Sequence, residues 1–129
     1  MWIFLNSSFL SIVSDKDNPG NLLVRARRNG DIQRVFPRAR VWKTPTSDYR
    51  YRASVPRAFA AKVLALQIEG IDYPNFKDSV HDIDRHMVYR DVWQQMAHWQ
   101  EVMAGKSRPQ RATLRQPKGR WRVFGKRVS

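Results

Sequence analysis

Aspartate and histidine side chains are concentrated in one stretch of the chain, and side chains of these types could bind a metal ion or act in catalysis. The stretch contains Asp78, His81, Asp82, Asp84, His86 and Asp91. Carboxylates and imidazoles can hold Zn²⁺, Mn²⁺ or Mg²⁺ and activate water for phosphodiester cleavage. The spacing argues against this, because the i, i+4 pairs of Asp82 fall at a predicted helix start, where capping and the helix dipole favour acids. We therefore predict no metal site and no catalytic residue, and a metal-dependent nuclease is the third hypothesis.

Other enzyme classes lack the side chains that they need. The chain has no Cys, which excludes thiolate zinc sites, thiol nucleophiles and disulfides. None of the six Gly residues belongs to a phosphate-binding G-x-x-x-x-G-K or G-x-G-x-x-G pattern. The serines have no coherent arrangement of histidine and acid around them. We expect a non-enzymatic protein without a cofactor.

The positive charge of the 129-residue chain is divided between two blocks. The net charge is +13. Residues 25–57 contain ten Lys and Arg against Asp31 and Asp48, a local net charge of +8, and residues 105–129 contain nine and no acid, a net charge of +9. The rest of the chain is slightly acidic. Such blocks concentrate polyanions, of which nucleic-acid phosphates are the commonest in a cell.

Hydrophobic periodicity predicts short strands at residues 2–5, 9–13, 22–28, 38–43 and 49–55. Asp31 is predicted to cap a helical turn that extends to Phe36. A helix capped by Ser54 and ended by a left-handed Gly70 has few polar positions, which predicts that it is deeply buried. A longer helix over residues 82–104 has one apolar stripe, formed by Val88, Val92, Met96, Trp99 and Met103.

These elements indicate an α+β fold, a mostly antiparallel sheet of about five short strands packed on one face by two to three helices. Gly105 and the prolines after it end the apolar periodicity. We therefore predict an α+β domain over residues 1–104 and a basic C-terminal arm or tail over residues 105–129. No segment approaches the roughly 18 apolar residues that span a bilayer, so we expect a cytoplasmic protein without membrane contact.

The alternation of the strands places most of the first basic block on one sheet face. If the helices cover the face that bears Val24, Ala26 and Tyr49, the pleat turns Arg25 and Arg27 to the opposite, open face. The same alternation places there Arg38, Arg40, Trp42, Arg50 and Arg52. Arginine suits bidentate phosphate contact, and an exposed tryptophan can stack on a base, as in proteins that bind single strands.

The C-terminal block interleaves aromatic with basic residues, as do arms that fold on binding nucleic acid. The residues predicted to make this contact are Arg111, Arg115, Lys118, Arg120, Trp121 and Arg122. The leading hypothesis is a nucleic-acid-binding or nucleoprotein-associated protein, with DNA or RNA as its partner. The alternative is a protein-interaction module, an inhibitor or a subunit of a larger complex, whose basic face meets an acidic partner surface. A merely solubilising role for the arginines is also open.

Four segments of the chain are distinctive, namely residues 71–80 (IDYPNFKDSV), residues 85–93 (RHMVYRDVW), the opening MWIFLN and residues 30–32 (GDI). These segments resemble parts of small uncharacterised proteins of proteobacteria and their phages. The resemblance covers residues 1–103 and ends before the long basic extension. It implies no activity and no catalytic residue, and an association with phages favours a small defence, counter-defence or regulatory component.

Overall fold

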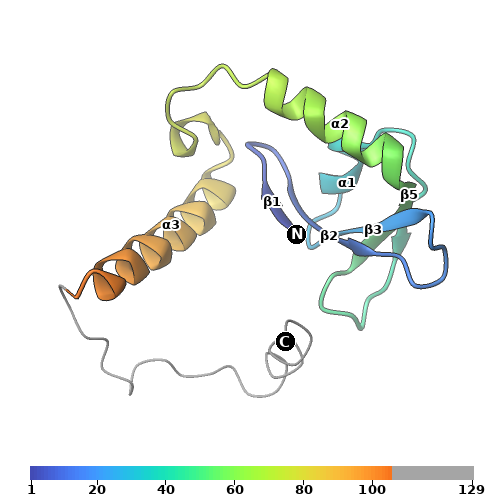
Figure 1. The fold of residues 1–129 in the computed structure, drawn as a ribbon, viewed down its shortest axis with the longest axis horizontal. Coiled ribbons are helices and arrows are strands. Elements are labelled where there is room, and N and C mark those ends of the chain that lie inside the picture. Colours follow the sequence, from blue (N-terminus) through green and yellow to red (C-terminus); the bar gives the residue numbers. More distant parts are fainter. Residues whose placement is uncertain (106–129) are drawn as a thin grey trace. The chain divides into compact units, whose positions relative to one another are not determined.

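The structure, a computed structural model, describes residues 1–105. Its elements are β1 (Trp2–Phe4), β2 (Phe9–Ser14), β3 (Asn21–Ala26), α1 (Asp31–Val35), β4 (Trp42–Lys43), β5 (Tyr51–Pro56), α2 (Arg57–Glu69), a 3-10 turn (Lys77–Ser79) and α3 (Ile83–Met103). The strands form one antiparallel sheet in the order β1, β2, β3, β5, β4, and α1 and α2 lie on one of its faces (Figure 1). The predicted α+β fold is confirmed.

The chain divides into two compact units, residues 1–90 and residues 91–129. The first unit contains the whole sheet, α1, α2 and the first turns of α3. The second contains the remainder of α3 and, beyond residue 105, residues outside the described part. This division falls inside α3, whereas the predicted border after residue 104 follows its last turn.

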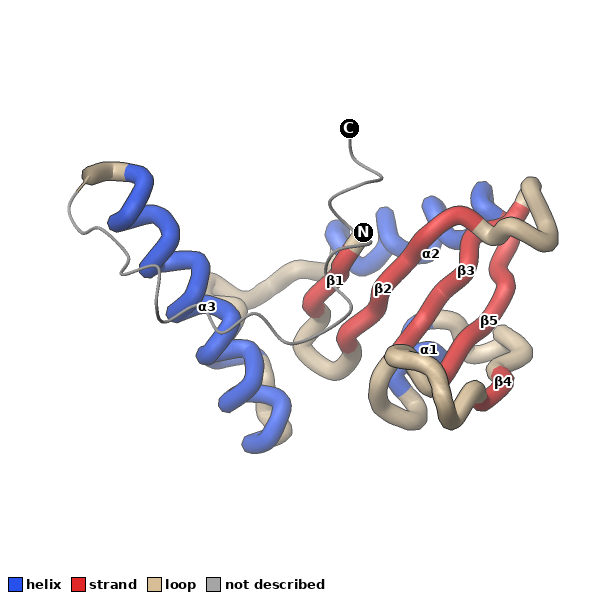
Figure 2. The backbone as a smooth tube through the Cα atoms, turned by 90° about the horizontal axis from the view of Figure 1, so that it is seen from below, coloured by secondary structure: helices blue, strands red, loops and turns tan. Residues whose placement is uncertain are grey.

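The core lies on the face of the sheet that α1 and α2 cover. Alternate residues of β2, β3 and β5 point to this face and are buried, namely Leu10, Ile12, Val24, Ala26, Ala53 and Val55. Ile32 of α1, Phe36 after it and Ala60 of α2 complete the cluster. Burying a large apolar side chain contributes about 1.5–3 kcal/mol, so this layer is the main source of stability. In Figure 2 the strands stand in front of α1 and α2, and neither of these two helices covers the opposite face of the sheet, which we call the open face.

The sequence predicts that Asp31 caps α1, and this prediction is wrong. Asp31 is instead the first residue of the helix, and it is buried. Gly30 precedes the helix with a φ of 94°, and Asp31 is 1% exposed. Its carboxylate accepts hydrogen bonds from Arg85 Nη2 at 2.7 Å and Arg85 Nη1 at 3.0 Å. It also accepts from Arg34 Nη1 at 2.9 Å and from the backbone N–H of Phe9 at 3.0 Å. Four donors thus stabilise one buried carboxylate.

Tyr89 extends this network to the turn between β1 and β2. Its hydroxyl lies 3.0 Å from the carbonyl oxygens of Leu5 and Ser8, and Arg85 Nη1 donates to it at 3.3 Å. Burial lowers the pKa of Arg85, but hydrogen bonds with Asp31 and Tyr89 outweigh this, so the pKa is raised. Burial also raises the pKa of the Tyr89 hydroxyl. The first turns of α3 are therefore anchored to the β1–β2 hairpin by a charged guanidinium and a neutral phenol.

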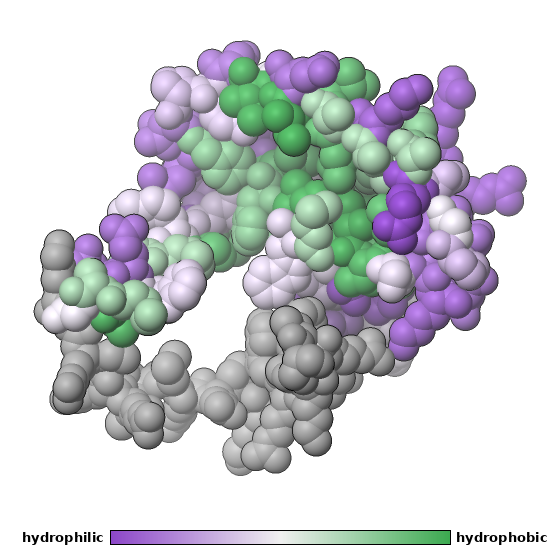
Figure 3. All heavy atoms as spheres, viewed as in Figure 1, coloured by the Kyte–Doolittle hydropathy of each residue, from purple (hydrophilic) through white to green (hydrophobic). Residues whose placement is uncertain are grey.

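The prediction that α2 is deeply buried is wrong. Of its 13 residues, all described, only Ala60 is buried, while Leu66 and Ile68 are 64% and 69% exposed. Gly70 has a φ of −82°, so it is not left-handed, and no side-chain hydrogen bond from Ser54 or another residue of the described chain caps the helix start. Figure 3 shows apolar residues on the surface of α2. The helix covers the core with one narrow face only.

Replacing Arg85 by Ala is expected to destabilise the protein by about 3–5 kcal/mol, because the Asp31 carboxylate stays buried without its main partner. Asp31→Asn is expected to have a comparable effect, and the double variant should lose less than the sum of the two losses, since both break one interaction. Urea unfolding measures the three free energies. The control is Arg90→Ala, an exposed position of the same helix. Losses below about 1 kcal/mol in both single variants would contradict the anchoring role of the pair.

Candidate nucleic-acid interface

A row of five side chains crosses the open face of the sheet from edge to edge. The strand register pairs Trp2 with Ser11, Ser11 with Arg25, Arg25 with Arg52, and Arg52 with Trp42. Directly paired residues of neighbouring strands point to the same face, and Ser11 alternates with core residues of β2. This cross-sheet row therefore lies opposite the core. Two tryptophans, one in each edge strand, bracket two arginines.

The row contains three of the predicted site residues, Arg25, Trp42 and Arg52. It also contains Trp2 and Ser11, which the sequence analysis missed. The alternation of Ser11 with apolar neighbours in β2 was a signal for its outward direction. Trp2 could be assigned to the row only from the register of β1 with β2, because alternation within one strand does not show which residue of the neighbouring strand lies beside a given residue.

Tyr49 belongs to the open face, and its predicted place on the covered face is wrong. The residue precedes β5, and its backbone N–H donates to its neighbour Asp48 Oδ1 at 2.9 Å, so the strand alternation does not continue through it. The residue is 4% exposed. The Cζ atoms of Arg25 and Arg27 lie 4.6 Å and 4.2 Å from the ring centroid. Tyr49 thus supports two guanidinium groups by cation–π contact.

Short contacts fix the two arginines of the cross-sheet row. Arg25 Nη2 donates to Ser11 Oγ at 2.7 Å, and Arg52 Nε donates to the Tyr49 carbonyl at 3.3 Å. Arg52 Nη2 also lies 3.5 Å from Asp48 Oδ1, an ion pair that offsets part of its charge. Burial lowers the pKa of Arg25, and the like charge of Arg52 lowers it further, against an opposing effect of Tyr49. The two guanidinium groups carry charges of the same sign and repel each other.

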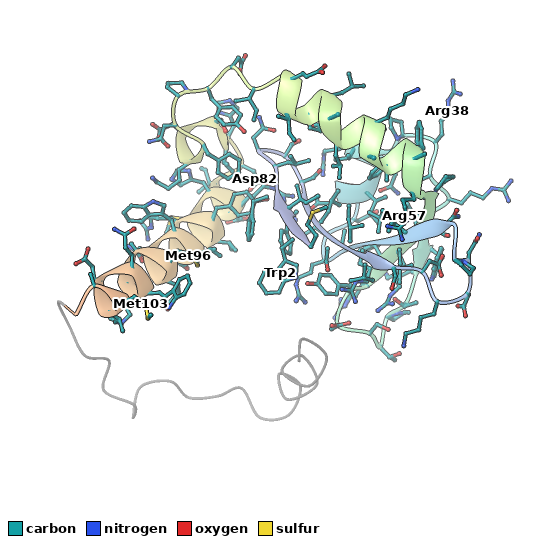
Figure 4. All side chains as sticks on the ribbon, in the orientation of Figure 1. Trp2, Arg38, Arg57, Asp82, Met96 and Met103 are labelled. Atoms are coloured by element: carbon teal, nitrogen blue, oxygen red, sulfur yellow. The ribbon has the colours of Figure 1, made fainter. Side chains whose placement is uncertain are left out.

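Arg38, Arg40 and Arg50 are exposed but lie outside the strands. Because β4 comprises only Trp42 and Lys43, the predicted strand over residues 38–43 is wrong for its first four residues. The chain turns here after α1, since the N–H of Ala39 bonds to the Phe36 carbonyl. Figure 4 shows Arg38 on the α2 side of the sheet, away from Trp2. The structure therefore does not bring Arg38 to the open face.

The first basic block is only partly neutralised. Within residues 1–105, Arg38, Arg40 and Arg50 form no ion pair, and neither do Arg25 and Arg27. Arg27 Nη1 donates to the Asp48 carbonyl at 3.0 Å, which holds its guanidinium without reducing its charge. The predicted contacts of the tail lie outside the described residues, and they involve Arg111, Arg115, Lys118, Arg120, Trp121 and Arg122.

The aspartate and histidine cluster stabilises the start of α3. Asp82 Oδ1 accepts the backbone N–H of Arg85 at 3.2 Å, which caps the helix and lowers the pKa of Asp82, and its Oδ2 pairs with Arg28 at 3.1 Å. His86 Nδ1 contacts the Lys77 carbonyl at 2.9 Å. Among residues 1–105, no three His, Cys, Asp or Glu side chains are grouped so that they could hold a metal ion.

Comparison of the chain with protein-family models, with curated proteins and with solved structures gave no match. Within the described residues, no helix combines the length and the apolar character that crossing a membrane requires. A functional interpretation must therefore start from the open face itself.

Replacing Tyr49 by Leu is expected to destabilise the protein by about 1–2 kcal/mol, because Arg25 and Arg27 lose the ring on which they rest. Tyr49→Phe is the matched control. It keeps the aromatic face and should stay within about 0.5 kcal/mol of the wild type. Thermal and urea unfolding measure both changes. If the Phe variant lost as much as the Leu variant, the hydroxyl rather than the cation–π contact would be responsible.

Proposed function

We propose that the protein binds nucleic acid, without catalysing a reaction, through the open face and the β4 edge of its sheet. The observation that carries this proposal is the direct pairing of Arg25 with Arg52 across neighbouring strands. Like charges placed directly opposite each other destabilise a sheet. An anion bound between them offsets that cost, and a phosphate group accepts hydrogen bonds from two guanidinium groups well.

The β4 edge extends the positive surface beyond the row. Arg40, Lys43 and Arg50 are exposed on or beside this edge strand, and none of them has a carboxylate partner in the described part of the chain. Figure 3 shows hydrophilic residues along the side of the molecule on which β5 lies. Several exposed cations with no acids between them can contact several phosphates of one backbone, and each contact adds to the affinity. The nine Lys and Arg after residue 104 add to the same attraction.

A solubilising role could explain the number of arginines, but it does not explain their placement. A surface adapted for solubility mixes both signs and keeps like charges apart. Here two arginines pair directly, and a third lies against the same tyrosine ring. Asp48 is the one carboxylate paired with these residues in the described chain, and it lies 3.5 Å from Arg52 alone.

The double variant Arg25→Gln, Arg52→Gln is expected to bind a labelled DNA of about 20 nucleotides at least tenfold more weakly, because each charge-assisted hydrogen bond contributes about 1.5–3 kcal/mol. The slope of log affinity against log salt should become shallower by about one unit or more. Fluorescence anisotropy at several salt concentrations measures both quantities.

The control for this titration is Lys62→Gln, which removes an exposed charge from α2 on the other side of the sheet. It should change affinity by less than about twofold. Wild-type protein that shows no affinity for single-stranded or duplex DNA or RNA at low salt would refute the proposal.

The second candidate function is a protein-interaction module, which α3 favours. Val92, Met96, Trp99 and Met103 follow one another at spacings of four, three and four, and they are 37%, 55%, 58% and 72% exposed. This spacing is the seam of paired helices, and exposed apolar surface of this extent marks interaction sites. Met96 and Met103 are labelled on α3 in Figure 4. Gln95 and Gln100 flank the seam without charge, so a second copy of the helix meets no like charge there.

If α3 pairs with a second copy, Trp99→Glu is expected to shift the protein from dimer to monomer, because it places two carboxylates in the seam. Gln94→Glu, on the opposite side of the helix, is the control and should leave the dimer intact. Sedimentation velocity over a range of protein concentrations distinguishes the two masses. A wild-type protein that is monomeric throughout that range would exclude self-association through α3.

A further inference from the structure

We infer that the ligand of the open face is a single strand, with unpaired bases stacked on Trp2 and Trp42. This inference rests on the proposed function and specifies the class of nucleic acid. The two indoles lie in the two edge strands, β1 and β4, and they are 49% and 43% exposed. About half of the surface of each tryptophan is thus accessible, and a stacking platform needs an accessible aromatic side chain.

The order of side chains along the cross-sheet row matches the chemistry of a single strand. Four strand spacings separate Trp2 from Trp42, which corresponds to about 19 Å. Aromatic rings stand at the two ends and guanidinium groups in the middle. A single strand of about four nucleotides, the lower end of the range for such sites, can stack its outer bases on the indoles while its phosphates cross the arginines.

Contacts within the sheet hold these guanidinium groups in place before any ligand arrives. Arg25 is held by Ser11 and by the Tyr49 ring, and Arg52 is held by the Tyr49 carbonyl and Asp48. Side chains fixed in this way lose little conformational freedom on binding. The centre of the row therefore has a fixed geometry for the backbone.

The aromatic surface continues beyond Trp2 on the β1–β2 hairpin. Phe9 lies edge-on to Trp2 with ring centroids 6.3 Å apart, and Phe4, its direct partner in the register, lies 4.7 Å from Phe9. Both phenyl rings are partly exposed, and Phe4 also lies edge-on to the Tyr89 ring at a centroid distance of 5.1 Å, so Phe9 offers the freer ring of the two. Every base has a π face that can stack on such rings, so we expect little sequence preference. A duplex keeps its bases stacked on each other, and it would offer this surface phosphates only.

The test compares four probes with the full-length protein at one salt concentration: oligothymidine and oligouridine of about 12 nucleotides, and DNA and RNA duplexes of equal length. Oligothymidine or oligouridine should bind at least tenfold more tightly than the corresponding duplex. Trp2→Ala and Trp42→Ala should each weaken binding of the single strand by about tenfold, the loss of one stacked base, and change duplex binding by less than twofold.

Two further variants complete the design. Trp42→Phe keeps a ring at the edge strand and should recover most of the affinity, and Leu66→Ala, at an exposed apolar position of α2, should leave single-strand binding unchanged. Equal binding of duplex and single strand, or tryptophan variants that bind as tightly as the wild type while the arginine variants do not, would overturn the inference and leave the proposed function standing. Failure to bind any of the four probes would overturn both. A preference between oligothymidine and oligouridine identifies DNA or RNA as the source of the strand.

Discussion

The buried ion pair of Asp31 with Arg85 is the interaction on which the arrangement of the sheet depends most. One carboxylate receives hydrogen bonds from the first turn of α3, from α1 and from the backbone at the start of β2. Tyr89, one turn further along α3, closes the network at the carbonyls of the β1–β2 turn. Two charges removed from water are tolerated only when their hydrogen bonds are satisfied, so this network fixes one position for the hairpin. The hairpin in turn determines where Trp2 and Ser11 lie.

The two faces of the sheet illustrate a division between stability and function. The covered face consists of apolar residues that pack beneath α1 and α2, and it contributes most of the free energy of folding. The open face gains little from burial and places Arg25 beside Arg52, and the Tyr49 ring beneath Arg25 and Arg27 offsets part of the charge repulsion. Unfavourable local electrostatics that persist in a folded protein often accompany a site for a ligand of opposite charge. In the proposed function, the phosphate backbone of a nucleic acid is that ligand.

The α+β fold, the first two strands and the long helix were predictable, because each depends on periodicity within a short segment. The large exposed fraction of α2 was not predictable. Its sequence is apolar on several sides, yet the five-stranded sheet is small, and one narrow helix face suffices to cover it. Asp31 was assigned to a cap because its partner, Arg85, lies 54 residues away, and a buried pair at that separation leaves no local pattern. Arg38 was assigned to a strand that the turn after α1 prevents from forming.

The sequence by itself determined the separation of charge into blocks and the alternation that turns Arg25 and Arg52 away from the core, since both are properties of residues close together in the chain. Only the tertiary structure decided that these arginines are direct neighbours and that Trp2, Ser11 and Trp42 share their row. Hairpin turns join β1 to β2, β2 to β3 and β4 to β5, but β3 and β5 are separated in the chain by α1 and β4, so their register depends on packing between distant segments. Alternation within a strand selects the face on which a side chain lies, and only the packing of the whole chain selects its neighbours.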